Sequence, residues 1–315
     1  MTPEEYCQRK AAGSGSSFYY SFLFLPPERR RAITALYAFC REVDDVVDEC
    51  ADPQLARTKL AWWRSELAAT YAGRPSHPVT QSLAEAVRAF SLPQELLAEI
   101  IDGMEMDLAQ TRYADFKALH LYCYRVASVV GLLAAEIFGY QDRHTLKYAH
   151  DLGLAFQLTN IIRDVGEDAR RGRIYLPADE KAQFGVSDED ILHARTTDAF
   201  RRLMEFQIDR AERCYEQAFA QLPPRDRRAQ RPGLVMAAIY RTLLREIRRD
   251  GCRVLDRRIA LTPIKRIDEV VTDAHLRARQ MFVQVPFGDV GVEVFGSPMK
   301  LSGTPPRTVG SVPQL

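Results

Sequence analysis

The sequence lacks the cysteine spacing of a metal-binding or disulfide-bonded protein. Its six cysteines form no Cys-x-x-Cys pair and show no metal-ligand spacing with the six histidines. We therefore expect reduced thiols that pack as small apolar side chains, which argues against a disulfide framework and a cysteine-ligated metal. These cysteines are Cys7, Cys40, Cys50, Cys123, Cys214 and Cys252.

A charge excess and a long apolar run are also missing. The net charge of +1 gives no concentrated basic field, so nucleic acid is not an expected partner. The longest apolar run, "VVGLLAAEIFG", is interrupted by Glu136 and is shorter than the roughly 20 residues of a membrane-spanning helix. The first residues, "MTPEEYCQRK", carry acids and no apolar segment of the kind found in secretory signals. We expect a cytoplasmic protein.

One segment is locally basic. "LLREIRRDGCRVLDRR" is rich in arginine, and we interpret it as a solvated helix face. Transient contact of this face with a membrane surface or with phosphate is the alternative. The arginines concerned are Arg245, Arg248, Arg249, Arg253, Arg257 and Arg258.

The sequence does contain helical periodicity over most of its length. With 46% hydrophobic and 27% charged residues among 315, the chain can bury a large core. Pro26 and Pro27 mark the start of a helix of about six turns, and short turns such as "AGRPSHP" and "LPPRDRR" separate the others. We predict helices at about 27–49, 54–72, 81–90, 93–110, 116–138, 142–170, 188–220 and 232–250. The fold is predicted to be one all-α bundle without internal repeats over residues 1–282.

The last residues differ in composition from the rest. The segment 283–315 is rich in Gly, Pro and Val, poor in charge, and has no helical period. We predict an irregular tail over 283–315, with a short hairpin around "FGDVGVEVFG" as the alternative.

Two acidic stretches, "REVDDVVDE" and "NIIRDVGED", each follow an apolar helix. Each residue advances a helix by about 100°, so residues spaced by four and three fall on one narrow stripe. The first stripe is Tyr37, Arg41, Asp44 and Asp48, and the second is Gly153, Gln157, Asn160, Asp164 and Asp168. Each stripe ends in two carboxylates one turn apart. Because apolar residues surround the second stripe, we expect Gln157 and Asn160 to face a cavity inside the bundle.

The presence of two such clusters indicates a metal site. Either cluster alone would be interpreted as a solvated helix end, but two carboxylate pairs that approach each other in a partly buried site repel strongly. Mg²⁺ is typically held by a few carboxylates together with water and phosphate. The pattern therefore predicts Mg²⁺, or Mn²⁺ in its place, for the binding and ionisation of a diphosphate. Nearby arginines could bind the remaining phosphate oxygens: Arg41, Arg163, Arg170, Arg171 and Arg173.

The helix "LHLYCYRVASVVGLLAAEIF" suits the wall of such a cavity. Loss of diphosphate leaves a carbocation, which needs aromatic faces and shielding from water. Tyr122 and Tyr124 supply aromatic and hydroxyl groups, and a stripe of small residues leaves room for a prenyl chain. Close packing of helices is the alternative role of that stripe, which is Ala127, Val130, Gly131 and Ala134.

These segments resemble the head-to-head prenyl transferases of the squalene and phytoene synthase family. The resemblance runs from about Ser17 to Arg266 and includes "YAFCREVDDVVDE", "YCYRVASVVG" and "QLTNIIRDVGEDARRGRIYLP". The segment "SGSSFYYSFLFLPPERRRAITALYAFCREVDD" is most similar to the bacterial presqualene diphosphate synthases of hopanoid biosynthesis. The resemblance implies an isoprenoid-synthase-type bundle with a central cavity. The Gly/Pro/Val tail stands where the family has a helical close.

The resemblance also implies roles for the matching residues. It implies two Mg²⁺ sites, formed by Asp44 and Asp48 and by Asp164 and Asp168. Diphosphate binding falls to Ser17, Tyr37 and Arg41, and the lining of the centre to Gln157, Asn160 and Tyr240. Tyr122 matches a tyrosine that handles a proton or stabilises the cation.

The implied reaction joins two molecules of farnesyl diphosphate to give presqualene diphosphate, which downstream squalene-forming enzymes would consume. Enzymes that make phytoene or dehydrosqualene would share every aspartate named above and are the main alternative. A head-to-tail prenyl transferase, a terpene cyclase and a non-catalytic lipid-binding protein are further alternatives. The stretch "GSGSSF" fails the G-x-G-x-x-G pattern and follows no strand, so no dinucleotide fold and no NADPH are expected.

Overall fold

The structure is a computed structural model that describes residues 1–13, 17–22, 25–50, 52–259, 282–287 and 290–295. The chain divides into two units, residues 1–260 and 261–315, which are described separately. The predicted division at 282/283 stays a prediction, because residues 260–281 lie outside the described residues.

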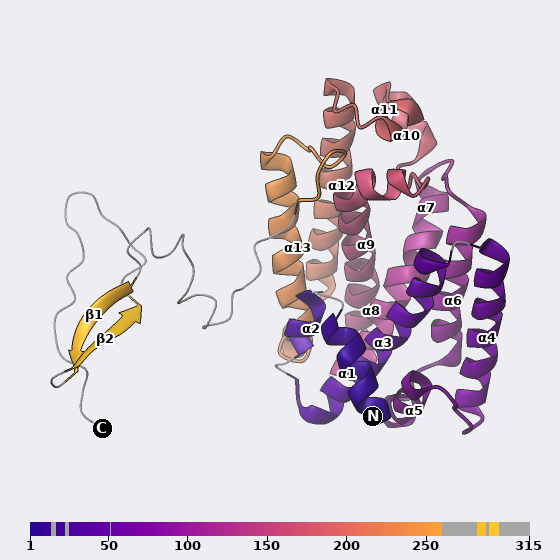
Figure 1. The fold of residues 1–315 in the computed structure, drawn as a ribbon, viewed down its shortest axis with the longest axis vertical. Coiled ribbons are helices and arrows are strands. Elements are labelled where there is room, and N and C mark those ends of the chain that lie inside the picture. The colour runs from indigo at the N-terminus through magenta and orange to yellow at the C-terminus, as the bar shows by residue number, and fades with distance from the viewer. Residues whose placement is uncertain (14–16, 23–24, 51, 260–281, 288–289, 296–315) are drawn as a thin grey trace. The chain divides into compact units, whose positions relative to one another are not determined.

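The first unit is a bundle of helices, which confirms the predicted fold class (Figure 1). Its first helices are α1 (Pro3–Gly13), α2 (Ser17–Phe22), α3 (Pro27–Glu49), α4 (Pro53–Tyr71), α5 (Pro78–Phe90) and α6 (Gln94–Ala109). Then follow α7 (Phe116–Cys123), the π-helical turn η1 (Tyr124–Ser128), α8 (Val129–Phe138) and α9 (His144–Arg170). The last are α10 (Ala178–Phe184), α11 (Asp188–Leu192), α12 (Asp198–Gln221), the 3₁₀ turn η2 (Pro224–Asp226) and α13 (Arg231–Arg249).

Helix α3 buries one face and leaves the other accessible. It begins at Pro27, where the missing N–H is harmless because the first turn of a helix leaves its N–H groups unpaired. The apolar side packs against α1, α5 and α6, and Leu36 and Val43 are fully buried. The predicted stripe from Tyr37 to Asp44 is only half-buried. The polar stripe of this helix is therefore partly accessible to solvent.

Helix α9 lies between α12 and α13 on one side and α8 on the other (Figure 1). Two glycines allow a close approach of backbones. A Cβ on Gly153 would lie 2.5 Å from the carbonyl oxygen of Ala127, and one on Gly131 would lie 2.3 Å from that of Ala149. At Gly131 the small-residue stripe therefore serves close helix packing, which was the alternative to a cavity wall.

Several helix boundaries differ from the predicted ones. The sequence pattern did not indicate α1, α2 or α10. The predicted single helix at 188–220 is wrong, because two capping residues start separate helices. Ser187 Oγ accepts from Asp190 N at 3.1 Å at the start of α11, and Thr197 Oγ1 accepts from Phe200 N at 3.1 Å at the start of α12. The predicted helix at 116–138 contains the π turn η1, an irregularity that is frequent at functional sites.

One helical stretch, Phe116–Phe138, is long and apolar enough to cross a membrane, and it is the only one among the described residues. In this fold its segments α7, η1 and α8 pack against α6 and α9. The bundle buries 44% of the apolar window of this stretch, while Leu121 stays exposed.

The second unit contains a β-hairpin. Strand β1 (Phe282–Phe287) pairs antiparallel with β2 (Val290–Phe295), in the register Phe282↔Phe295 and Val285↔Val292. The predicted irregular chain is therefore wrong over these strands, and the hairpin alternative is correct. The physical reason is the valine-rich alternation within 282–287 and 290–295, which outweighs the Gly and Pro content of the segment.

Candidate active site

Arg41 contacts two carboxylates of the first acidic cluster. Its Nη1 donates to Asp44 Oδ2 at 2.6 Å, and its Nη2 donates to Asp45 Oδ1 at 2.7 Å. Burial raises the pKa of Asp44 to about 6, and Asp48 and Asp45 add to the shift although Arg41 opposes it. One arginine therefore does not neutralise this cluster.

The second cluster lies at the end of α9, where Asp164 and Asp168 are one turn apart. Arg163 Nε donates to Asp164 Oδ1 at 2.7 Å, and Arg258 Nε lies 3.3 Å from the same oxygen. Burial raises the pKa of Asp168 to about 7, and Asp164 adds to the shift against the opposing charge of Arg173. The sequence reasoning did not assign Arg258 to this cluster.

Ion pairs join the two clusters. Asp48 at the end of α3 accepts from Arg171 Nη1 at 2.8 Å and from Arg173 Nη1 at 2.9 Å. Both arginines directly follow α9. Asp48 and Arg171 are 123 residues apart in the sequence, so the fold brings the ends of the two stripes together.

The donor set fits a hard divalent cation. Within the described ranges, no three His, Cys, Asp or Glu side chains lie close enough together to hold a metal ion, and the aspartates pair with arginines instead. Mg²⁺ needs only one or two carboxylates when phosphate and water complete its coordination shell. Burial is the main cause of the raised pKa values of Asp44 and Asp168, and the neighbouring aspartates add to it despite the opposing arginines. Carboxylate oxygens suit Mg²⁺ or Mn²⁺.

A buried carboxylate that the sequence did not single out lies beside Tyr122. Asp107 on α6 accepts from Tyr122 Oη at 2.9 Å and from Tyr175 Oη at 2.7 Å. Its charge helps to raise the pKa of both Asp44 and Asp168, so it lies within electrostatic reach of both clusters. The sequence feature that could have identified Asp107 is its position on the apolar stripe of α6, because a buried acid requires hydrogen-bond partners.

Gln157 and Asn160 lie on the half-buried face of α9. Asn160 Nδ2 donates to Gln157 Oε1 at 3.4 Å. Asn160 Oδ1 is buried and has no hydrogen-bond partner among the described residues. A buried acceptor of this kind is a suitable place for a donor from a ligand or a water molecule.

Tyr240 on α13 connects the two stripes on the inner side. Burial raises the pKa of Tyr240, the charge and hydrogen bond of Arg163 oppose the shift, and nearby Tyr37 adds to it. The ring of Tyr240 packs edge-on against Phe156, with ring centroids 5.1 Å apart. The structure therefore brings Tyr37, Arg163 and Tyr240 together from three helices. The side chain of Ser17 lies outside the described residues.

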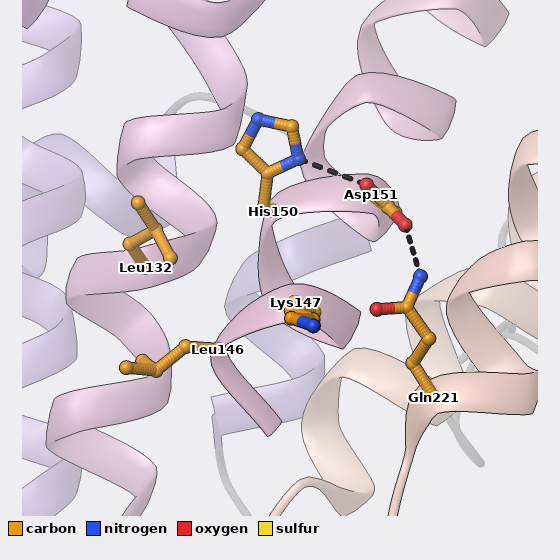
Figure 2. Close-up of a pocket in the computed structure, with 6 residues that line it drawn as sticks. All are labelled: Leu132, Leu146, Lys147, His150, Asp151 and Gln221. Atoms are coloured by element: carbon orange, nitrogen blue, oxygen red, sulfur yellow. Dashed lines mark hydrogen bonds and ion pairs between the residues drawn. The ribbon is translucent and has the colours of Figure 1, made fainter. Parts of the chain in front are cut away.

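A cavity among α8, α9 and α12 lies away from the acidic clusters. It has a volume of about 580 Å³, and in it His150 Nδ1 and Gln221 Nε2 bind Asp151 at 2.9 and 2.6 Å (Figure 2). Its lining residues are Leu132, Leu146, Lys147, His150, Asp151 and Gln221. A cavity of about 410 Å³ between α1 and α3 includes Arg41 and Asp45 and adjoins the first cluster.

Acidic side chains pair with several arginines of the basic segment around the end of α13. Arg248 Nε donates to Glu205 Oε2 at 2.7 Å, and its Nη2 donates to Asp209 Oδ1 at 2.5 Å. Arg253 Nη2 donates to Asp250 Oδ1 at 3.0 Å. These arginines therefore form ion pairs within the chain, on a surface that solvent reaches.

Known proteins are similar to this chain in sequence and in fold. The chain is 38% identical over 267 residues to the chloroplastic phytoene synthase of Narcissus pseudonarcissus. The aligned region covers 83% of this chain and 63% of that enzyme. The chain thus spans less than two thirds of the length of that relative.

Two solved structures have a similar fold. The squalene synthase HpnC of Alicyclobacillus acidocaldarius superposes with a TM-score of 0.71 at 30% identity, covering 79% of this chain and 94% of that one. A dehydrosqualene synthase in complex with a ligand gives a TM-score of 0.71 at 29% identity, covering 79% and 87%. The family described as squalene/phytoene synthase matches residues 11–265, a span that contains both aspartate stripes and the tyrosines beside them. The match covers most of the chain, and the chain forms a helical bundle similar to that of the solved structures. The chain therefore belongs to the squalene/phytoene synthase family.

Proposed function

We propose that this chain joins two molecules of farnesyl diphosphate head to head, forming presqualene diphosphate and releasing one diphosphate. The supporting observation is the meeting of the two clusters, in which Asp48 pairs with Arg171 and Arg173 at the end of α9. A diphosphate bound there would contact cationic groups and carboxylates from both helices. The similarity to a squalene synthase supports a condensation of the squalene type.

Four aspartates would hold Mg²⁺, or Mn²⁺ in its place: Asp44, Asp48, Asp164 and Asp168. When bound, the metal would neutralise the charge that develops on the departing diphosphate. Arg171 and Arg173 are placed to exchange Asp48 for phosphate oxygens, which a guanidinium binds through two parallel hydrogen bonds. Three residues around the first cluster are proposed to bind the diphosphate with them: Ser17, Tyr37 and Arg41.

The inner face of the bundle suits an allylic cation. Aromatic faces attract cations, and Phe156 and Tyr240 present their rings next to the second stripe. Gln157 and Asn160 add polar atoms there, including the unpaired acceptor of Asn160. The first farnesyl diphosphate loses its diphosphate, the double bond of the second attacks the resulting cation, and loss of one proton closes a cyclopropane ring.

Tyr122 is proposed to handle that proton or to stabilise the cation. The products are presqualene diphosphate, one diphosphate and one proton. The reaction therefore consumes no reductant, and we propose that no NADPH is used.

Analysis of the products tests this proposal. Purified protein incubated with farnesyl diphosphate and Mg²⁺ should release presqualene diphosphate both with and without NADPH, and excess EDTA should stop turnover. Squalene as the main product in the presence of NADPH would show a complete squalene synthase instead. Full turnover in EDTA would contradict the role of the metal.

Phytoene synthesis from two molecules of geranylgeranyl diphosphate is the second candidate. The observation that favours it is the 38% identity to a phytoene synthase. Supplying both diphosphates in equal amounts decides between the two. Phytoene as the dominant product would establish the second candidate, and dehydrosqualene formed from farnesyl diphosphate would establish the related reaction of a similar structure.

We also propose that the enzyme works in the cytoplasm and passes its product to downstream squalene-forming enzymes. The paired arginines around the end of α13 support a solvated surface there. Sedimentation with anionic vesicles should recover little of the substrate-free protein. Strong, salt-sensitive recovery would favour the membrane-surface alternative instead.

A further inference from the structure

Three stacked tyrosines surround one buried carboxylate next to the aspartate clusters. The rings of Tyr122 and Tyr175 stack with centroids 5.1 Å apart, and those of Tyr113 and Tyr175 stack at 5.8 Å. Asp107 is only 8% exposed beside them. The rings therefore keep water away from this carboxylate.

Each oxygen of Asp107 accepts one tyrosine hydroxyl. Oδ2 accepts from Tyr122 at 2.9 Å, and Oδ1 accepts from Tyr175 at 2.7 Å. In the part of the chain that the structure describes, no lysine or arginine forms an ion pair with Asp107. Burial raises the pKa of Asp107 to about 6, although both tyrosines and the more distant Arg173 oppose the shift. Two hydroxyl groups thus compensate the buried charge only in part.

Three separate segments deliver these groups. Asp107 comes from α6 and Tyr122 from α7. Tyr175 is held by backbone pairing, in which Ile174 N donates to Thr111 O at 3.0 Å and Ala178 N donates to Tyr113 O at 2.9 Å. Arg173 in the same segment binds Asp48 at 2.9 Å. The cluster is therefore tied directly to the first aspartate stripe.

A purely structural role would not require a carboxylate here, because an uncompensated buried charge destabilises the folded state. We propose that Asp107 is a positioning residue for the condensation: it fixes the Tyr122 hydroxyl with its proton toward Asp107, which leaves the oxygen lone pairs of Tyr122 available to the reacting prenyl chain. Tyr175 holds the second carboxylate oxygen and prevents the group from rotating. This inference rests on the proposed function.

The variant Asp107→Asn tests the role of the carboxylate. An amide accepts through one atom and donates through the other, so one of the two tyrosine hydroxyls must turn around. We expect kcat for farnesyl diphosphate to fall roughly 100-fold with KM close to that of the wild type, the size of effect typical of a misplaced proton-handling group. The thermal midpoint should stay the same or rise, because a buried charge is removed.

A double-mutant cycle separates positioning from a general structural effect. If Asp107 acts through Tyr122, then adding Asp107→Asn to Tyr122→Phe should cause no further loss of kcat. Glu66→Gln is the matched control, a buried carboxylate elsewhere that should alter stability and leave kcat unchanged. If Asp107→Asn does not fold, the same cycle is run with Tyr175→Phe, which should lower kcat only when Tyr122 is present.

Two outcomes would overturn the inference. In the first, the losses of kcat from Asp107→Asn and Tyr122→Phe multiply in the double variant. In the second, Asp107→Asn keeps the kcat of the wild-type protein. Failure of the proposed function is distinguishable from both. In that case the wild-type protein itself would consume neither farnesyl nor geranylgeranyl diphosphate.

Discussion

Glu66 and Asp107 are two buried carboxylates with opposite electrostatic behaviour. Glu66 on α4 is 5% exposed and Asp107 on α6 is 8% exposed. Glu66 accepts from Ser76 N at 2.6 Å, His77 N at 2.8 Å and Thr80 Oγ1 at 2.6 Å, and also from the Ser76 hydroxyl at 2.7 Å. Among the described residues, Asp107 accepts hydrogen bonds from two tyrosine hydroxyls only.

The difference in donors reverses the pKa shift. Burial would raise the pKa of Glu66, but the hydrogen bonds from Thr80, His77 and Ser76 outweigh it and lower the pKa to about 2. Burial raises the pKa of Asp107 to about 6. A carboxylate with enough donors stabilises the fold as an anion, whereas Asp44, Asp107 and Asp168 carry charge at the expense of stability. The carboxylate at the corner between α4 and α5 thus stabilises the fold, whereas the aspartate clusters are the ones proposed to bind a cation.

The largest expected effect concerns catalysis by the cluster carboxylates. Asp44→Asn or Asp168→Asn should lower kcat by about a thousandfold or more, because in the proposed reaction each removes a charged oxygen from the diphosphate site. The helical circular dichroism and the thermal midpoint should not decrease, since a destabilising charge is lost. Glu49→Gln, on the same helix as Asp44 but off its stripe, should keep nearly the activity of the wild type. A variant that unfolds and yet retains its specific activity would show that the carboxylate belongs to the scaffold.

The opposite effect is expected at Glu66. In Glu66→Gln the amide nitrogen would face donors that now lack an acceptor, so the free energy of unfolding should fall by about 2–3 kcal/mol. Urea unfolding measures this loss, and kcat at a temperature where the variant is folded should be unchanged. Because the pKa of Glu66 is lowered in the folded state, its stabilisation is present above the unfolded pKa of about 4.3 and is lost as the pH falls toward 2. Unchanged stability, or a loss of kcat in the folded variant, would remove the distinction between the two regions.

Local signals made the helices and the stripes predictable. Pro27 marks the start of α3, and the spacing from Tyr37 to Asp48 spans only three turns. The partners of Asp107 were not predictable, because Tyr122 and Tyr175 lie 15 and 68 residues away in the sequence and only the tertiary fold brings them together.

Other errors came from competing local signals. The predicted helix continues across 193–197, but Ala194 has a positive φ of 53° and Thr197 caps a new helix, so the predicted helix is divided in two. In the tail, the valine alternation of the hairpin competes with a composition that is typical of irregular chain. A capping hydrogen bond at Thr197 and the pairing of two strands in the tail therefore decided the local structure, against the average composition of each segment.

The smallest expected effect is the pH dependence of stability without metal. The folded state binds protons on Asp107 and Asp168 more tightly than the unfolded state, where an aspartate has a pKa of about 3.9. The free energy of unfolding contributed by each group is therefore lost as the pH rises toward its folded pKa of about 6 or 7, at no more than about 1.4 kcal/mol per pH unit. His77 and His120 act in the opposite direction, because burial lowers their pKa values.

Comparison with a variant isolates the aspartate contribution from that of the histidines. Urea unfolding of the wild type and of Asp168→Asn in EDTA, at about pH 5, 6 and 7, should show a steeper decline for the wild type. Adding Mg²⁺ with inorganic diphosphate should reduce that difference, because cations compensate the same charge. Identical slopes in the two proteins would mean that Asp168 is already neutralised in the folded chain, and the contrast between Glu66 and the cluster carboxylates would then not extend to α9.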